Sequence, residues 1–227
     1  MKTIVVGDIH GCYKELKQLI IDLKDNQEYN KDTDRLIFLG DYIDRGKDSC
    51  KVIQYIKELQ KENDNVIALM GNHEKMCIEY ITQNENIWLY NGYQATLNSY
   101  GSYKELIKDV EWMKSLPLYY EDENYVYAHA GINPNKPLKE NSDYELLWQR
   151  EGFVYSRAMF DKTVIFGHTP SQCVAQNDKP YKTSANNVGI DTGCVFGGNL
   201  TALIIENGEV IKFYQESFED EDIEQIS

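Results

Sequence analysis

The chain has 227 residues, 42% of them hydrophobic and 12% aromatic, so it is long enough to bury a sizeable core. Its 23 basic and 37 acidic residues give a formal net charge of −14, which argues against coating nucleic acid or binding an anionic membrane. No apolar run reaches the length of a transmembrane helix or of a signal-peptide core, so we expect a cytoplasmic protein.

The first part of the chain alternates predicted strands with predicted helices. Short apolar runs predict buried strands at 3–6, 36–39 and 66–70. Apolar residues at helical spacing follow the first two strands, over 13–24 and at Val52, Ile53, Ile56 and Leu59. Repeated alternation of strand, loop and helix predicts a parallel sheet flanked by helices.

The middle and the second half differ in pattern. Residues 74–116 are predicted to be helical, and Ser102 with Glu105 predicts a capping box. Strands are predicted after Pro117, at 125–128, 164–166, 188–190, 200–205 and 210–213. The dipeptide Asn207-Gly208 between the last two predicts a hairpin.

The chain shows no repeat, linker or change of composition that would divide it. We therefore expect a single α/β domain over 1–214 and an acidic, loosely ordered tail over 215–227, where six of thirteen residues are Asp or Glu. Five scattered cysteines without a C-x-x-C pair predict reduced thiols, most of them small buried residues.

Two acidic residues, Asp41 and Asp44, come directly after the second predicted strand and Gly40. Burying carboxylates there costs desolvation and like-charge repulsion, which a cation would offset. Asp41 is therefore a candidate metal ligand. Short Asp-rich loops also supply ordinary turn and cap residues, and this motif alone leaves both interpretations open.

The four histidines of the chain each follow a predicted strand, at His10, His73, His129 and His168. A single histidine beside an apolar run is more often a satisfied core residue. Four in equivalent positions favour a shared site, because the carboxyl ends of strands in an open α/β sheet converge on one ligand.

The side chains at these strand ends have the composition of a metal site. The candidate ligands are two carboxylates, one amide and three imidazoles, supplied by Asp8, His10, Asp41, Asn72, His129 and His168. This mixture suits Mn, Fe or Zn better than Ca or Mg. Six side chains are too many for one ion with open positions, so we expect two ions, with Asp41 bridging them. Such a pair activates a water as nucleophile and clamps a phosphoryl group.

Several sequence blocks resemble the signature blocks of the phosphoprotein phosphatase family of metallophosphoesterases. They are Gly7-Asp8-Ile9-His10-Gly11, Gly40-Asp41-Tyr42-Ile43-Asp44-Arg45-Gly46, Gly71-Asn72-His73-Glu74, His129-Ala130-Gly131 and Gly167-His168. Blocks at 147–151, 165–170 and 190–193 resemble the small branch found in bacteria and bacteriophage lambda. The resemblance implies an α/β fold with a central β-sandwich flanked by helices, in four layers α/β/β/α.

The resemblance also implies roles for the site residues. It divides the ligands between two ions, with Asp8, His10 and Asp41 at one and Asp41, Asn72, His129 and His168 at the other. His73, oriented by Asp44, would protonate the leaving oxygen, while Arg45 and Arg150 would bind the phosphate oxygens. A surface salt bridge is the alternative for Arg150.

The function expected from these features is that of a manganese-dependent phosphomonoesterase acting on phosphoserine or phosphothreonine in proteins, or on a small phosphoester, through a hydroxide held by two metals. A dinucleoside polyphosphate hydrolase is the alternative on the same site, and a non-catalytic phosphate-binding module is a further one. The intact Asp44, the Glu74 that follows His73, and the absence of basic clusters near the motifs favour the phosphatase. The oligomeric state stays open.

Overall fold

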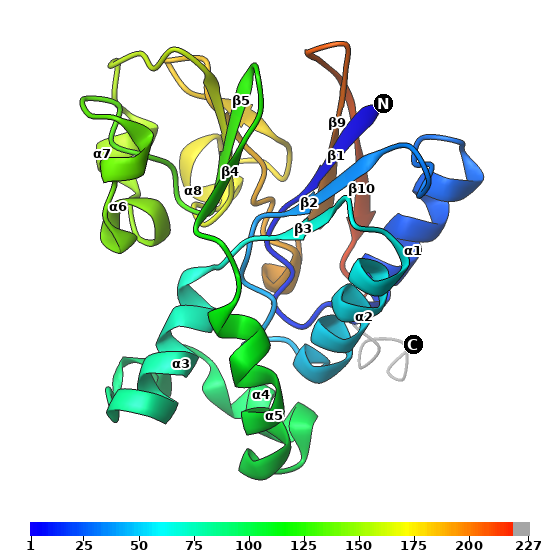
Figure 1. Cartoon of the computed structure of the whole chain (residues 1–227), viewed down its shortest axis with the longest axis vertical. Coiled ribbons are helices and arrows are strands. Elements are labelled where there is room, and N and C mark those ends of the chain that lie inside the picture. The colour runs from blue at the N-terminus through cyan, green and yellow to red at the C-terminus, as the bar shows by residue number, and fades with distance from the viewer. Residues whose placement is uncertain (220–227) are drawn as a thin grey trace.

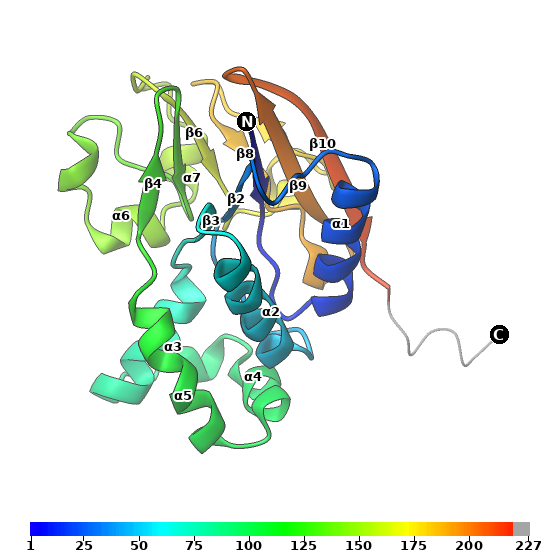
Figure 2. The ribbon, with the colours of Figure 1, turned by 45° about the vertical axis from the view of Figure 1, so that its right-hand side comes forward.

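Two five-stranded sheets lie against each other in the computed structural model, which describes residues 1–219, and helices cover their outer faces (Figure 1). The first sheet has the order β10-β9-β1-β2-β3 and the second the order β4-β5-β6-β8-β7. The predicted four-layer metallophosphoesterase-type architecture is confirmed, with α1 and α2 on one side and α6 and α7 on the other (Figure 2).

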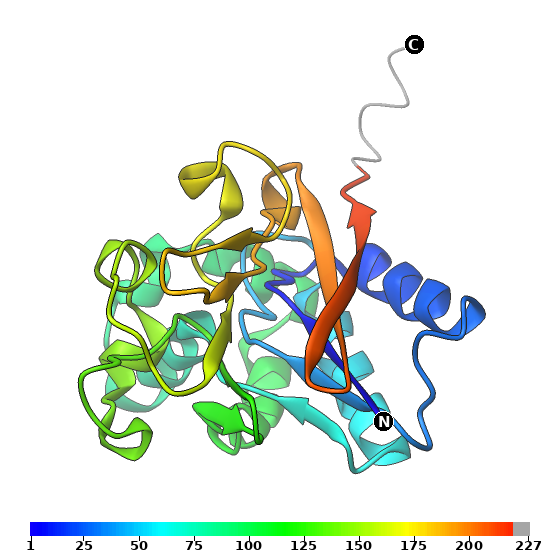
Figure 3. The same cartoon turned by 90° about the horizontal axis from the view of Figure 1, so that it is seen from above.

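The first sheet contains the predicted parallel unit and the predicted hairpin. Its strands are β1 (Lys2–Val6), β2 (Arg35–Phe38), β3 (Val66–Ala68), β9 (Asn199–Glu206) and β10 (Glu209–Ser217). β1, β2 and β3 are parallel, whereas β9 pairs antiparallel with β1 and with β10. Asn207 and Gly208 both have positive φ, as the tight turn between β9 and β10 requires (Figure 3). The sheet is therefore mixed rather than wholly parallel.

The second sheet is built from shorter strands. They are β4 (Tyr119–Glu121), β5 (Tyr125–Ala128), β6 (Thr163–Phe166), β7 (Tyr181–Lys182) and β8 (Val188–Gly189). β5, β6 and β8 are parallel and correspond to predicted strands, while β4 and β7 are antiparallel edge strands that the sequence does not predict. With three and two residues, these two are too short to show an alternating pattern.

The helices form three groups. The outer face of the first sheet carries α1 (Tyr13–Asp25) and α2 (Ser49–Glu62). The predicted helical middle consists of α3 (Asn72–Gln83), η1 (Ile87–Tyr90), α4 (Tyr93–Tyr100) and α5 (Tyr103–Lys114). Short helices of the second half are η2 (Leu138–Glu140), α6 (Asp143–Leu147), α7 (Glu151–Val154), α8 (Ser171–Val174) and η3 (Cys194–Phe196).

Cap geometry agrees with the sequence in part. Ser102 accepts a hydrogen bond from the backbone N–H of Glu105, which is one half of the predicted capping box. A complete capping box, not predicted, starts α6, where Ser142 and Glu145 satisfy each other's backbone N–H groups. Caps therefore fix where these helices begin.

Alternating side chains divide the apolar core into two layers. Val5, Ile37 and Leu203 of the first sheet pack with Tyr127 and Ile165 of the second in the space between the sheets. Their chain neighbours in β1 and β2, such as Ile4 and Phe38, belong instead to the larger core beneath the helices. Both faces of each central strand are buried, which explains the nearly continuous apolar runs in the sequence.

The C-terminal boundary lies further along the chain than expected. β10 continues to Ser217, so residues 215–217 of the predicted tail belong to a strand, and 220–227 lie outside the described residues. The five cysteines are free thiols, and three of them are buried: Cys12, Cys77 and Cys194. Across residues 1–219, no helix has the length and apolar composition needed to cross a bilayer.

Candidate active site

The predicted site residues come together at one edge of the two sheets. Asp8 follows β1, Asp41 follows β2, Asn72 and His73 begin α3 after β3, and His129 and His168 follow β5 and β6. All six candidate ligands are at most 5% exposed. The parallel strands of both sheets point their carboxyl ends at this spot, as the sequence predicts.

Asp41 lies at the centre of the group. Its Oδ2 is 3.3 Å from His10 Nε2, and its Oδ1 is 3.4 Å from His129 Nε2. The backbone N–H of His73 also donates to Oδ1, at 3.0 Å. Burial acts to raise the pKa of Asp41, but the surrounding imidazoles, His129 foremost, hold this pKa well below its usual value. Asp41 therefore carries negative charge where both halves of the site meet.

The geometry of the histidines fits a metal centre. The Nδ1 atoms of His10 and His129 lie 2.8 Å and 3.0 Å from the carbonyl oxygens of Ile43 and Leu39. Because a carbonyl only accepts, each Nδ1 must carry the proton, which leaves the Nε2 lone pair directed at the site. Burial lowers the pKa of His129 to about 4, so this imidazole is neutral.

Two overlapping triads could hold a metal ion: His10, Asp41 and His73, and Asp41, His129 and His168. The Nε2 atom of His168 is buried without a hydrogen-bond partner among the described residues, as expected of a ligand whose partner is a cation. Asn72 adds its Oδ1, 2.8 Å from His129 Nε2. The residues present therefore fit a metal centre, although the first triad contains His73 where the sequence implies Asp8.

Asp8 belongs to neither triad in this structure. Both of its carboxylate oxygens accept the backbone N–H of His168, at 3.1 Å and 3.0 Å. Burial raises its pKa well above the usual value, and the charges of Asp191 and Asp41 raise it further. A cation near Asp8 would offset the electrostatic repulsion between these buried carboxylates.

The backbone at the site is unusual. Five site residues have φ between 45° and 72°, a left-handed conformation that side chains other than glycine rarely adopt: His10, Asp41, Asp44, Arg45 and His168. Each lies in a loop directly after a strand. Such conformations persist where surrounding contacts fix them, and they concentrate at functional sites.

His73 and Asp44 form the predicted pair. The Nδ1 of His73 lies 2.6 Å from Asp44 Oδ2. Asp44 is fully buried, and it also accepts hydrogen bonds from Trp88 Nε1 at 2.8 Å and Thr96 Oγ1 at 2.6 Å. Burial lowers the pKa of His73, and the negative charges of Asp41 and Asp44 oppose this. Asp44 thus orients His73, but burial outweighs the effect of the two carboxylates on the pKa of His73.

The carboxyl of Glu74 has a structural role that the sequence does not reveal. It accepts the backbone N–H groups of Asp41, Tyr42, Ile43 and Gly71 at 2.8–3.3 Å. Burial, with the charge of Asp41, raises its pKa to about 8. Glu74 thereby ties the loop after β2 to the start of α3. A Cβ at Gly71 would lie 2.2 Å from Asp41 N, so only glycine permits this approach.

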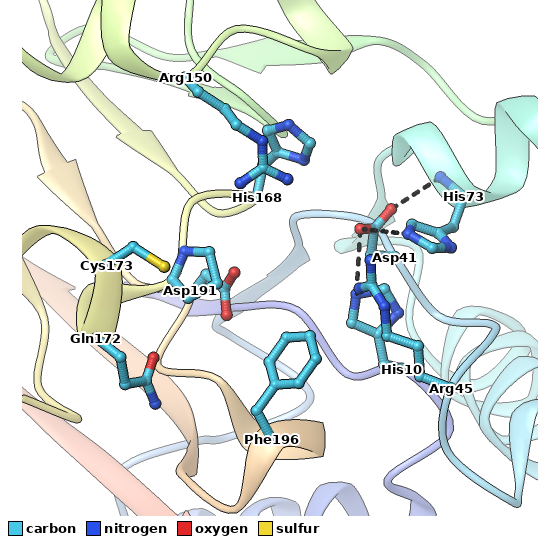
Figure 4. A pocket seen from close by; sticks show the side chains of 11 residues that line it. His10, Asp41, Arg45, His73, Arg150, His168, Gln172, Cys173, Asp191 and Phe196 are labelled. Atoms are coloured by element: carbon cyan, nitrogen blue, oxygen red, sulfur yellow. Dashed lines mark hydrogen bonds and ion pairs between the residues drawn. The ribbon is translucent and has the colours of Figure 1, made fainter. Parts of the chain in front are cut away.

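The two predicted phosphate-binding arginines face one cavity of about 460 Å³ (Figure 4). Arg45 contacts Nε2 of His10, on the side of Asp41 and His73. Arg150 precedes α7 and is exposed on the side of His168. Within residues 1–219 it forms no ion pair, so no contact of the described residues supports the alternative of a surface salt bridge.

Five further residues line the cavity, and the sequence does not identify them as site residues. They are Asp191, Pro170, Gln172, Cys173 and Phe196. Asp191 is buried and follows β8, as Asp8 and Asp41 follow their strands. Its position after a predicted strand therefore indicates a site residue. The others lie in loops or on short helices without a periodic pattern.

A mixed fold of two helix-flanked sheets, with carboxylates, an amide and imidazoles gathered at the strand ends, defines a metallophosphoesterase. The chain belongs to the Calcineurin-like phosphoesterase family, which matches residues 1–214. This confirms the resemblance to metallophosphoesterases that the signature blocks predict.

The chain is also similar to individual proteins over most of its length. It is 30% identical to a bis(5'-nucleosyl)-tetraphosphatase PrpE [asymmetrical] of Anoxybacillus flavithermus, with 88% of each chain covered. Identity to the protein of the same name from Oceanobacillus iheyensis is 29%, over 89% of this chain and 88% of the relative.

Solved structures show the same fold. One titled a putative diadenosine tetraphosphatase superposes with a TM-score of 0.72 at 21% identity, covering 96% of this chain and 94% of the other. A protein serine/threonine phosphatase from Saccharomyces cerevisiae superposes with a TM-score of 0.67 at 18% identity, covering 97% and 80%. At these identities the likeness concerns the fold alone.

Replacing Glu74 by glutamine tests the connection between the loop after β2 and α3. The amide NH₂ of Glu74→Gln would face backbone N–H donors, so we expect the free energy of unfolding to fall by about 2–4 kcal/mol. Urea denaturation at pH 9, where the native carboxyl is ionised, measures this.

The matched control is Glu79→Gln on the same helix. Glu79 is partly exposed and 3.6 Å from Lys75 Nζ, so its loss should cost less than about 1 kcal/mol. Equal stability of the two variants would show that the hydrogen bonds of Glu74 contribute little.

Proposed function

We propose that the protein is a metal-dependent hydrolase of bis(5'-nucleosyl) tetraphosphates. The observation that carries the proposal is its similarity to the two PrpE relatives along 88% or more of both chains. A cavity of about 460 Å³ beside the buried ligands supports it, because this volume suits a ligand larger than one phosphate group.

This proposal reverses the order of the two hydrolase functions expected from the sequence. The position of Glu74 after His73 predicts a protein phosphatase, but its carboxyl accepts hydrogen bonds from backbone N–H groups and Glu74 is 0% exposed. A residue that does not face the cavity carries no information about the substrate. The lack of basic clusters is no stronger an argument, since an aromatic side chain can also hold a nucleotide.

The metal ions would be held as the resemblance implies, by Asp8, His10 and Asp41 at one position and by Asp41, Asn72, His129 and His168 at the other. Bound there, they would act as Lewis acids that neutralise charge on the phosphoryl oxygens and acidify water. The mixed oxygen and nitrogen donors suit Mn, with Fe or Zn as other candidates.

The remaining side chains would bind and orient the substrate. Arg45 and Arg150, on opposite sides of the cavity, would hold oxygens of the polyphosphate chain by bidentate hydrogen bonds. His73, held by Asp44 at 2.6 Å, would donate a proton to the leaving oxygen through Nε2.

Phosphomonoester hydrolysis is the second candidate, and the His73–Asp44 pair favours it. An alkoxide is a poor leaving group and needs the proton of a general acid, whereas a polyphosphate leaves more readily without one. A pair this well ordered, with Trp88 and Thr96 as further donors to Asp44, would serve a phosphoserine or phosphothreonine protein or a small phosphoester.

A comparison of substrates on one Mn-loaded preparation tests the proposal. We expect diadenosine tetraphosphate to be hydrolysed with a higher kcat/KM than a phosphoserine peptide. Chromatography of the nucleotides should show AMP and ATP in equal amounts if the four-phosphate chain is cut asymmetrically. Preference for the peptide would restore the phosphatase, and turnover of neither substrate by metal-loaded protein would favour a phosphate-binding module.

Substitution of Asp41 tests the metal site. Asp41→Asn keeps the shape of the side chain but removes the charge shared by both triads, so metal content and turnover should both fall by at least about 10-fold. Elemental analysis and a hydrolysis assay measure the two effects. Asp143→Asn, at a 53% exposed side chain, is the control and should keep both values.

Full activity in protein shown to be free of metal would contradict the two-metal interpretation. Treatment of the wild-type protein with a chelator gives the same information without mutation. Activity should be lost on chelation and return when Mn is added.

Substitution of His73 tests the general acid. His73→Asn should retain metal content near that of the wild type, while turnover of an alkyl phosphate falls by about 10²–10⁴-fold. Turnover of diadenosine tetraphosphate should fall less, because its leaving group needs less protonation. An equal fall for both substrates would show that His73 positions the substrate rather than donating a proton.

A further inference from the structure

Phe196 is an exposed aromatic residue in the wall of the cavity. It is 61% exposed and ends the short helix η3, and Figure 4 shows its ring pointing into the space between Asp191 and Arg45. A single exposed aromatic residue is ordinary on a protein surface. Phe196 differs because it lines the same cavity as His10, Asp41 and the two arginines.

The backbone that carries Phe196 is held in place by its neighbours. Gly193 and Gly197, on either side of η3, have φ of 68° and 84°. The N–H of Gly193 donates to Oδ1 of Asp191 at 3.0 Å, and the N–H of Phe196 donates to Gly193 O at 2.9 Å. The first residue of η3, Cys194, is 2% exposed and packs in the core. Little backbone conformational entropy is therefore lost when a ligand packs on the ring.

The ring lies beside a phosphate-binding group. The Cζ atom of Arg45 is 5.3 Å from the centre of the Phe196 ring. A phosphate held by Arg45 would therefore have an aromatic surface next to it. Gln172 and Cys173 line the same cavity on the side of the ring away from Arg45 (Figure 4).

We infer that Phe196 is a specificity-determining residue that stacks on a nucleobase of the substrate, next to the phosphate bound by Arg45. This inference rests on the proposed function, since it assigns the part of the cavity that binds the nucleoside. Aromatic side chains bind any base by its flat face, so this contact would select nucleotides over phosphopeptides without selecting one base.

The test separates binding of the base from binding of the phosphate chain. We would measure KM for diadenosine tetraphosphate and, in the same assay, the inhibition constant of inorganic tetraphosphate, which has no base. In Phe196→Ala the ratio of KM to this inhibition constant should rise by about 5- to 100-fold, the range for losing one stacked base. Phe196→Tyr keeps the ring and should keep the wild-type ratio.

The base-free inhibitor accounts for any displacement of Arg45, because a disturbed arginine would weaken both ligands alike. Phe213→Ala on β10 is the matched control, since Phe213 is 43% exposed and does not line the cavity. It should keep the wild-type ratio. Circular dichroism and metal content would show that each variant is folded.

The outcomes distinguish this inference from the proposed function. Hydrolysis of diadenosine tetraphosphate by the wild type, with an unchanged ratio in Phe196→Ala, would overturn only the role of Phe196. A wild type that does not hydrolyse the dinucleotide would overturn the proposed function, and the inference with it.

Discussion

The position of Asp41 depends on the buried carboxyl of Glu74. The loop after β2 carries three consecutive residues whose N–H groups point at this one side chain. Without it, buried N–H groups would lack partners and the loop would have no reason to keep a left-handed residue at its start. The first turn of α3, which carries Asn72 and His73, is held by the same carboxyl through Gly71. One side chain therefore sets the distance between the central carboxylate and the residues that approach it from the next strand.

The electrostatics of the site follow from this close arrangement. Asp8, Asp41, Glu74 and Asp191 are all buried, and burial acts to raise the pKa of each. Asp41 alone among them has a pKa held well below the usual value, because imidazoles surround it. Asp41 is therefore firmly ionised, whereas ionisation of the nearby carboxyls of Asp8 and Asp191 requires further positive charge. Arg45 supplies part of it, since its charge acts to lower the pKa of both Asp8 and Asp191.

Much of this arrangement could be predicted from the sequence, and the reasons are physical. His10, Asp41, His129 and His168 each follow an apolar run, and strand ends meet at one edge of a sheet, so convergence follows from topology. The hairpin at Asn207-Gly208 was equally clear, because few dipeptides accept positive φ at both positions.

Other features depend on contacts that leave no trace in a single sequence. The partners of Glu74 are backbone N–H groups, which nearly every residue has, so the sequence does not reveal its structural role. Phe196 and Gln172 reach the cavity from the short helices η3 and α8, whose positions are set by tertiary packing. The strands β4 and β7 form by pairing with β5 and β8, and their own residues show no alternating apolar pattern.

The order of strands in the first sheet also bears on how the protein is made. β1 is an interior strand whose partners are β2 and β9, and these lie about 30 and 200 residues further along the chain. The hydrogen bonds from His168 to Asp8 span 160 residues. During synthesis the N-terminal β-α units therefore leave the ribosome with the β1 edge of the sheet unpaired, and with Asp8 and Asp41 lacking the contacts that His168 and His129 provide. The metal-binding edge can be completed only after His168, the last candidate ligand, and β9 have been translated, and contacts of such long range form slowly.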